Sequence, residues 1–332
     1  PSDDVYDKAK GVSFDLDWDL GGMIFRSLSS YNESDKRIQV DLSGSDVVIN
    51  EEDDTHIYET FSQEFQLISG EDSKAQWILG TFFYNENSNV LQQLELNNFF
   101  DITGPLDPVV IPVEIDASSL GVFGQVDYPI TDQLSVIAGL RYNKDKKDVF
   151  SGLFIPAFGL VAADGGPVIT SDESDEWSKS TGKIGLNYQL SDDLLLYISY
   201  SNGYKSGGYN LTQADSYAPE TVEAFEAGMK SVWFESRIQT NVSAYYYDYT
   251  NKQEFTRDPI VGTTNLINSG KASVYGIEAE MSARITEGLS IDSSISYTEA
   301  EYDEFFSEDE SAPELGFQDL AGNQLPRIPE WK

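Results

Sequence analysis

The sequence contains no cysteine and only one histidine, His56. The absence of cysteine excludes disulfide scaffolds, thiolate metal sites and cysteine nucleophiles. A single histidine excludes metal sites built from several imidazoles, and a Ser-His-Asp triad would have to use this one residue in an acidic segment. We therefore predict that the protein is not an enzyme and carries no cofactor.

Basic residues are scarce as well. The chain has 21 Lys and Arg against 57 Asp and Glu, which gives a net charge of −36. A protein that binds nucleic acid through its phosphates needs a basic face, so nucleic acid is not an expected partner. The acids gather in runs at 51–54, 172–176 and 299–310. A solvated, self-repelling loop surface explains these runs, and a cation-attracting vestibule or calcium-bridged loops are the alternative.

The chain also lacks an apolar run of about 18 residues, so no transmembrane helix is encoded. It starts at Pro1 in a polar stretch without the pattern of a signal peptide. The last residues, Leu325 to Lys332, resemble the approach to a further strand. We expect from these ends an internal fragment of a longer protein.

What the sequence does contain is six pairs of segments in which apolar and polar residues alternate, the pattern of half-buried β-strands. The expected strands are 12–20, 22–31, 58–68, 75–85, 120–128, 134–144, 177–190, 194–204, 220–233, 237–249, 266–285 and 289–302. Many reach ten residues, which exceeds the usual five or six of a globular strand and fits a tilted membrane strand of about 9–11.

The connections between these segments alternate strictly in length. The short joints lie at 20–22, 69–74, 129–133, 191–193, 234–236 and 286–288, and long polar loops are expected at 32–55, 85–117, 148–176, 205–219, 255–264 and from 305 onward. Short turns at one end and long loops at the other are typical of outer-membrane β-barrels. We predict an all-β fold, an antiparallel transmembrane β-barrel of the outer-membrane type that is incomplete, in the form of an open curved sheet.

The alternation assigns side chains to two faces. Lumen-facing residues are predicted to be Asp15, Asp17, Asp19, Glu64, Arg141, Lys183, Glu226, Lys230, Glu278, Glu280 and Arg284. Lipid-facing residues are predicted to be Leu194, Leu196, Ile198, Phe225, Met229, Tyr275, Ile277 and Met281.

Some of these residues invite more specific hypotheses. The three aspartates are expected to be hydrated lumen carboxylates, with cation coordination as the alternative. The candidates for an inter-strand charge ladder are Glu226, Lys230, Glu278, Glu280 and Arg284. Aromatic content is 13%, and the cluster Tyr245, Tyr246, Tyr247 and Tyr249 is interpreted as part of an interfacial girdle. The role of four loop aromatics is open, because they could contact a bulky ligand or belong to the girdle: Phe99, Phe100, Phe154 and Phe158.

Several stretches resemble the barrel domain of TonB-dependent outer-membrane receptors. They include Phe61-Ser-Gln-Glu-Phe-Gln-Leu67, Trp77-Ile-Leu-Gly-Thr-Phe-Phe-Tyr84, Val122-Phe-Gly-Gln-Val-Asp-Tyr128, Tyr200-Ser-Asn-Gly-Tyr-Lys-Ser-Gly-Gly-Tyr-Asn210, Ala218-Pro-Glu-Thr-Val-Glu-Ala-Phe-Glu-Ala-Gly-Met-Lys230, Asn268-Ser-Gly and Val274-Tyr-Gly-Ile-Glu-Ala-Glu280. Their order and spacing over about residues 11–331 carry the resemblance. The whole chain, 1–332, is thus expected to be part of such a barrel domain, with twelve of about 22 strands and without the plug domain or the C-terminal strands.

The resemblance implies a monomeric receptor in the outer membrane of a Gram-negative bacterium. Its partners would be outer-membrane lipid, TonB through a plug segment outside this chain, and a scarce bulky nutrient, with a ferric siderophore as the default. Two alternatives stay open at this stage, a passive porin or channel without a plug, and a surface adhesin barrel.

Overall fold

The computed structural model describes residues 4–41, 50–96, 109–154, 162, 165, 168–210, 216–257, 264–308 and 316–332. Throughout these ranges every regular element is a β-strand. Twelve strands form one antiparallel sheet in which each strand pairs with its neighbours in chain order. They are β1 (Asp4–Asp19), β2 (Met23–Asp41), β3 (Asn50–Ser69), β4 (Gln76–Leu96), β5 (Val109–Pro129), β6 (Leu134–Leu153), β7 (Val168–Ser191), β8 (Leu194–Lys205), β11 (Glu220–Trp233), β12 (Ile238–Thr250), β15 (Lys271–Thr286) and β16 (Leu289–Glu304).

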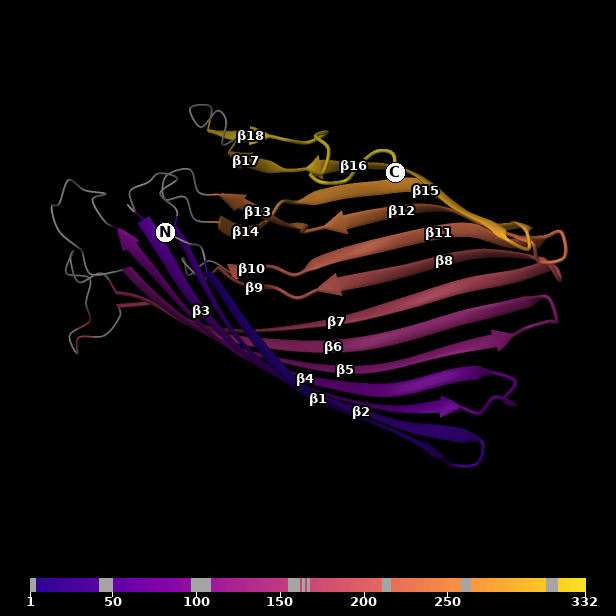
Figure 1. Ribbon diagram of the computed structural model, residues 1–332, viewed down its shortest axis with the longest axis horizontal. Helices are drawn as coiled ribbons and strands as arrows, with labels where there is room; N and C mark the ends of the chain where they lie inside the picture. The colour runs from indigo at the N-terminus through magenta and orange to yellow at the C-terminus, as the bar shows by residue number, and fades with distance from the viewer. Residues whose placement is uncertain are drawn as a thin grey trace.

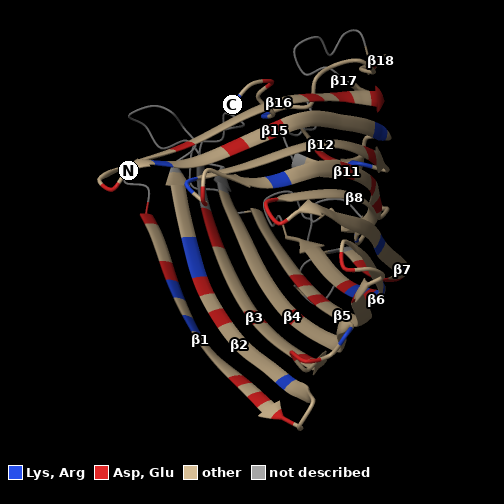
Figure 2. Cartoon of the chain, turned by 90° about the vertical axis from the view of Figure 1, so that its right-hand side faces the viewer, with Lys and Arg blue, Asp and Glu red and all other residues tan. Residues whose placement is uncertain are grey.

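The sheet is curved and open, and β1 and β16 form its two edges (Figures 1 and 2). The short turns lie together at one end and the long connections at the other (Figure 1). The predicted all-β fold, the twelve strands and the asymmetry of their connections are therefore confirmed. In the described ranges no helix is long and apolar enough to cross a membrane.

Three short hairpins project at the end with the long connections (Figure 1). They are β9 (Gly208–Tyr209) with β10 (Ser216–Tyr217), β13 (Gln253–Arg257) with β14 (Thr264–Asn268), and β17 (Phe306–Glu308) with β18 (Phe317–Asp319).

The prediction was wrong about how far the main strands extend. β2 to β7 are 19–24 residues long, and segments expected as loop, such as 32–41 and 109–117, continue the ladder. In 32–41 most side chains on both faces are polar, so hydropathy no longer alternates although the backbone groups still pair. The expected strand 266–285 is also divided, because Gly270, with a φ of 107°, separates β14 from β15.

Small residues let the strands approach closely where an aromatic ring crosses from a neighbour. A Cβ built on Gly228 would lie 2.7 Å from the Tyr197 ring, and one on Gly276 would lie 2.6 Å from the Tyr245 hydroxyl oxygen. Each glycine thus leaves the space that the ring of an adjacent strand fills. This packing fixes the positions of tyrosines along the sheet.

The best-buried apolar cluster lies near the β16 edge. It contains Ala272, Val274, Ala300, Tyr302 and Leu325. Leu325 reaches it because segment 323–332 runs along β16, where Leu325 N donates to Ala300 O at 3.0 Å and Ser296 N donates to Lys332 O at 3.0 Å. The segment expected to lead into a further strand therefore pairs with β16.

Candidate functional site

The two faces of the curved sheet are distinguished by contacts that skip a strand. The Tyr245 hydroxyl on β12 lies 2.8 Å from Thr298 Oγ1 on β16, although β15 lies between them. Lys147 Nζ on β6 donates to Gly207 O, beyond β7 and β8, at 2.8 Å. Such contacts form only on the concave side of a curved sheet. We name this concave surface the inner face and the convex surface the outer face.

The strand register then assigns the remaining side chains. Residues directly opposite each other on neighbouring strands share a face, and one such row runs from Asp17 through Arg26 and Gln66 to Arg141. Alternation along each strand extends this assignment. The eleven residues predicted to face a lumen all fall on the inner face, and the eight predicted to face lipid all fall on the outer face.

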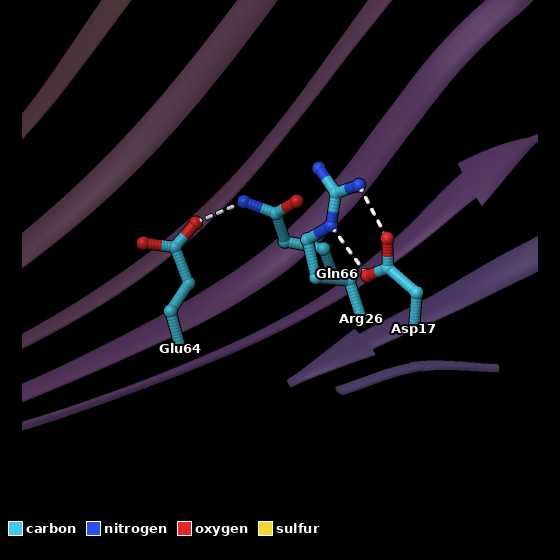
Figure 3. Close-up of polar contacts among 4 residues, drawn as sticks. All are labelled: Asp17, Arg26, Glu64 and Gln66. Atoms are coloured by element: carbon cyan, nitrogen blue, oxygen red, sulfur yellow. Dashed lines mark hydrogen bonds and ion pairs between the residues drawn. The ribbon is translucent and has the colours of Figure 1, made fainter. Parts of the chain in front are cut away.

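The aspartates of β1 make contacts within the protein. Asp17 binds Arg26 through two hydrogen bonds of 2.7 Å, and next to this pair Gln66 donates to Glu64 (Figure 3). Asp19 Oδ1 accepts the Gly21 backbone N–H at 2.7 Å and so caps the first turn. Because two of the three carboxylates are already committed, their geometry does not support the alternative of cation coordination. The described residues contain no group of three or more potential metal ligands.

The charge ladder expected between β11 and β15 is not formed. The ion pairs of the described residues include none of the five ladder candidates. Instead the Tyr197 hydroxyl donates to Glu226 at 2.5 Å, the Lys230 ammonium lies 5.9 Å from the Tyr197 ring centroid, and Asn241 Nδ2 donates to Glu280 at 3.4 Å. With few cations in the chain, hydroxyl and amide donors occupy the carboxylates.

The tyrosine cluster of β12 is divided between the two faces. Tyr245, Tyr247 and Tyr249 lie on the inner face and pack against the apolar cluster at Leu325. Only Tyr246 lies on the outer face, opposite Phe225 and Tyr275. The interpretation of all four as one girdle was therefore wrong, because successive side chains of a strand point to opposite sides.

Two of the long connections are fastened to each other by side-chain amides. We call the described residues 206–210 and 216–219, together with 251–257 and 264–270, the loop pair. Asn210 both donates to Leu266 O, at 2.9 Å, and accepts from Leu266 N, at 2.7 Å. Asn268 makes the same two-way contact with Ala218, and Gln253 Nε2 donates to Ser206 O and Ala218 O. The amides replace the backbone ladder where strand pairing ends.

The loop pair is held against the inner face of the sheet. The Lys147 ammonium reaches Gly207 O, and Tyr209 lies 6.5 Å from the Trp177 ring, centroid to centroid. Gly207 permits this approach, because a Cβ there would lie 2.5 Å from Tyr217 O and 2.8 Å from the Trp177 ring. Burial lowers the pKa of Lys147.

A cleft of about 310 Å³ lies between the inner face and the loop pair. Tyr84, Glu86, Asp145 and Lys147 line it from β4 and β6, and Tyr209 and Tyr217 line it from the loop pair. The Tyr84 hydroxyl donates to Glu86. Burial and a hydrogen bond to Asp175 raise the pKa of Tyr209, and burial raises the pKa of Tyr217. Both tyrosines are thus neutral at pH 7 and present aromatic faces and hydroxyl donors next to carboxylates.

Ion pairs join the strands beyond the apolar band. The Arg37 guanidinium binds Asp53 on the outer face and lowers the pKa of that carboxyl, mainly through the hydrogen bonds. His56 on the inner face contacts the Tyr58 hydroxyl at 3.1 Å, and burial lowers the pKa of the imidazole. His56 is therefore mostly neutral at pH 7 and contributes little positive charge to the inner face.

Sequence reasoning missed the cleft. Tyr84, Lys147, Tyr209 and Tyr217 carry no linear motif that would place them together, since they come from different strands and loops. Of the loop aromatics considered as ligand contacts, Phe154 forms an isolated bridge with Val110. Phe99, Phe100 and Phe158 lie outside the described residues.

The chain is similar to known receptors in sequence. It is 26% identical over 182 residues to the pesticin receptor of Yersinia enterocolitica, covering 53% of this chain and 25% of that one. It is 25% identical over 190 residues to the ferric-pyoverdine M114 receptor PbuA of Pseudomonas sp. strain M114, covering 57% of this chain and 22% of that one. The chain thus spans about a quarter of the length of these curated relatives.

Solved structures share the fold. The ferric yersiniabactin uptake receptor FyuA of Yersinia pestis superimposes with a TM-score of 0.80 at 17% identity, covering 100% of this chain and 46% of that one. The siderophore receptor PiuA of Acinetobacter baumannii gives a TM-score of 0.74 at 16% identity, covering 99% and 52%. The family model for the TonB dependent receptor-like β-barrel matches residues 1–332. The chain therefore belongs to the TonB-dependent receptor β-barrel family.

Proposed function

We propose that this chain forms part of the barrel wall and the extracellular loops of a receptor that imports a ferric siderophore across the outer membrane of a Gram-negative bacterium. The observation that carries the proposal is the family match over all 332 residues. The relatives add support, since they include a ferric-pyoverdine receptor and a ferric yersiniabactin uptake receptor.

The two faces of the sheet fit this role. The outer face presents exposed apolar residues such as Val122, Leu140, Ile198 and Ile277 in a band next to the short turns. We assign this band to lipid and the short turns to the periplasm. The inner face, with its hydrogen-bonded polar residues, then lines the lumen, and the strand ends beyond the band carry the loop pair outside the membrane.

The proposed receptor acts by binding and transport, without chemical conversion of its cargo. Its partners are outer-membrane lipid, the ferric chelate and TonB, which would supply the energy for transport through a segment outside this chain. We expect a monomer, because a closed barrel leaves no strand edge to pair with another chain.

Uptake of radiolabelled ferric chelates by cells with and without the complete gene tests the proposal. We expect uptake to require the gene and to stop when TonB is deleted or the proton gradient is collapsed. Gene-dependent uptake that continues without TonB would identify a passive channel and contradict the proposal. Normal iron uptake together with lost surface attachment would favour an adhesin.

A further inference from the structure

The positively and the negatively charged side chains of the inner face differ in number and in the contacts that they make. Several of its cations are held in structural contacts: Arg26 binds Asp17, and Arg141 lies 5.4 Å from the centroid of Phe123 and donates to Asn143. Lys147 donates to a loop carbonyl. Its carboxylates are more numerous, and several accept hydrogen bonds from tyrosine hydroxyls, as Glu86 and Glu226 do. Since a neutral donor satisfies a carboxylate without cancelling its charge, the field of this surface is negative.

Several of these carboxylates lie at the cleft. Glu86 and Asp145 lie in its wall, and their charges act on Lys147, as does the opposing charge of Lys205. The Lys146 side chain lies on the outer face, where it is paired with Asp148 at 2.7 Å. The charges of Glu173 and Asp175 act on Tyr209 on the opposite side. The described residues that line the cleft include no arginine, so they offer no planar, bidentate donor for an anionic ligand.

We propose that the cleft binds a positively charged group of the ferric chelate, and that the receptor accordingly favours neutral or cationic chelates over anionic ones. Glu86 and Asp145 supply the counter-charge, and the faces of Tyr84, Tyr209 and Tyr217 supply aromatic surface for an ammonium. An anionic chelate would lose its hydration there without gaining an arginine partner from the described lining of the cleft. This inference rests on the proposed function and narrows its substrate class.

A matched series of ligands separates charge from shape. A linear ferric trihydroxamate with a free terminal amine carries a charge of +1, the acetylated form is neutral, and the succinylated form carries −1. Calorimetric titration of the full-length receptor with the three complexes is expected to give affinity in the order cation, neutral complex, anion. The spread should shrink at high salt, because ions screen exposed charges.

Two double variants test whether the cleft carboxylates set the preference for a cationic chelate. Glu86→Gln with Asp145→Asn removes both cleft charges and should reduce the ratio of cation to anion affinity by about tenfold, as expected for charges roughly 6 Å from the ligand in a water-like dielectric screened by physiological salt. Glu114→Gln with Asp116→Asn removes the same number of charges from the outer face of β5 and should leave the ratio unchanged.

The outcomes distinguish this inference from the proposed function. Tightest binding of the anion, equal binding of all three complexes, or equal effects of the two double variants would overturn the inference and leave siderophore uptake intact. If no ferric chelate binds or enters cells through the folded receptor, both the uptake proposal and this inference are overturned.

Discussion

An arginine in place of Ile198 provides a sharp test of the assignment of the outer face to lipid. Ile198 is 57% exposed on the outer face of β8 and lies between Leu186 on β7 and Ala227 on β11. If this surface meets hydrocarbon, Ile198→Arg forces a guanidinium into the bilayer. The cost of arginine on the lipid face of an outer-membrane barrel is about 2–4 kcal/mol at the midplane and about 0–1 kcal/mol near the interfaces.

The position along the strand sets the magnitude. β8 begins at Leu194, after the short turn. With a rise of about 3.3 Å per residue and a tilt near 40°, each residue advances roughly 2.5 Å through a band about 25 Å tall. Ile198 then lies roughly 10 Å into the band, near its middle, and Leu196 lies about half as deep. We expect a loss of about 3 kcal/mol for Ile198→Arg and of about 1–2 kcal/mol for Leu196→Arg.

Denaturant titrations of the full-length receptor folded into lipid vesicles measure these losses. Ser199→Arg is the matched control, because Ser199 lies on the inner face of the same strand, directly opposite Glu226. Its cost should stay below about 1 kcal/mol, since the new guanidinium remains hydrated and gains a carboxylate partner. Equal losses at 198 and 199, or a larger loss at 196 than at 198, would refute the assignment of faces or of depth.

Three further perturbations address packing, the loop pair and the strand ends. Gly228→Ala should cost about 1–3 kcal/mol in the same titration, because the new methyl group would lie 2.6 Å from Val242 O. The control is Gly288→Ala, whose methyl group meets no atom within 4 Å and should cost less than about 0.5 kcal/mol. Similar losses in the two variants would refute the steric argument. Lys147→Gln should speed amide hydrogen exchange in residues 206–210, because it removes the ammonium that donates to Gly207 O. Lys146→Gln changes a side chain on the outer face and should leave this exchange unchanged. Unchanged exchange in the Lys147 variant would show that Lys147 does not hold the loop pair. Arg37 lowers the pKa of Asp53 below its ordinary value of 3.8, so the folded state releases this proton more readily than the unfolded state. The ion pair therefore stabilises the folded state above about pH 4. This stabilisation is lost as the pH falls through the lowered pKa. Arg37→Gln should therefore speed exchange at the β2 and β3 ends at pH 6 and make little difference at pH 2, and an equal effect at both values would contradict the ion-pair explanation.

The sequence by itself determined the fold class, the number of main strands and which residues of each strand share a side. These features follow from local rules. Alternation with a period of two in Val12 to Leu20 or Leu194 to Tyr204 identifies both the strand and its two sides, and a short joint makes neighbouring strands antiparallel. The same rule, applied residue by residue, would also have separated Tyr246 from Tyr245 and Tyr247.

Only the tertiary structure decided where the strands end, which contacts the inner face makes and that a cleft exists. Beyond the apolar band, hydrogen bonding between backbones continues while hydropathy carries no signal, so segments such as 32–41 read as loop. Glu226 accepts from Tyr197 and not from a lysine because the register brings that hydroxyl within reach. The cleft needs the curvature of the sheet, since Lys147 and Gly207 are 60 positions apart and meet only where the concave face brings distant strands together.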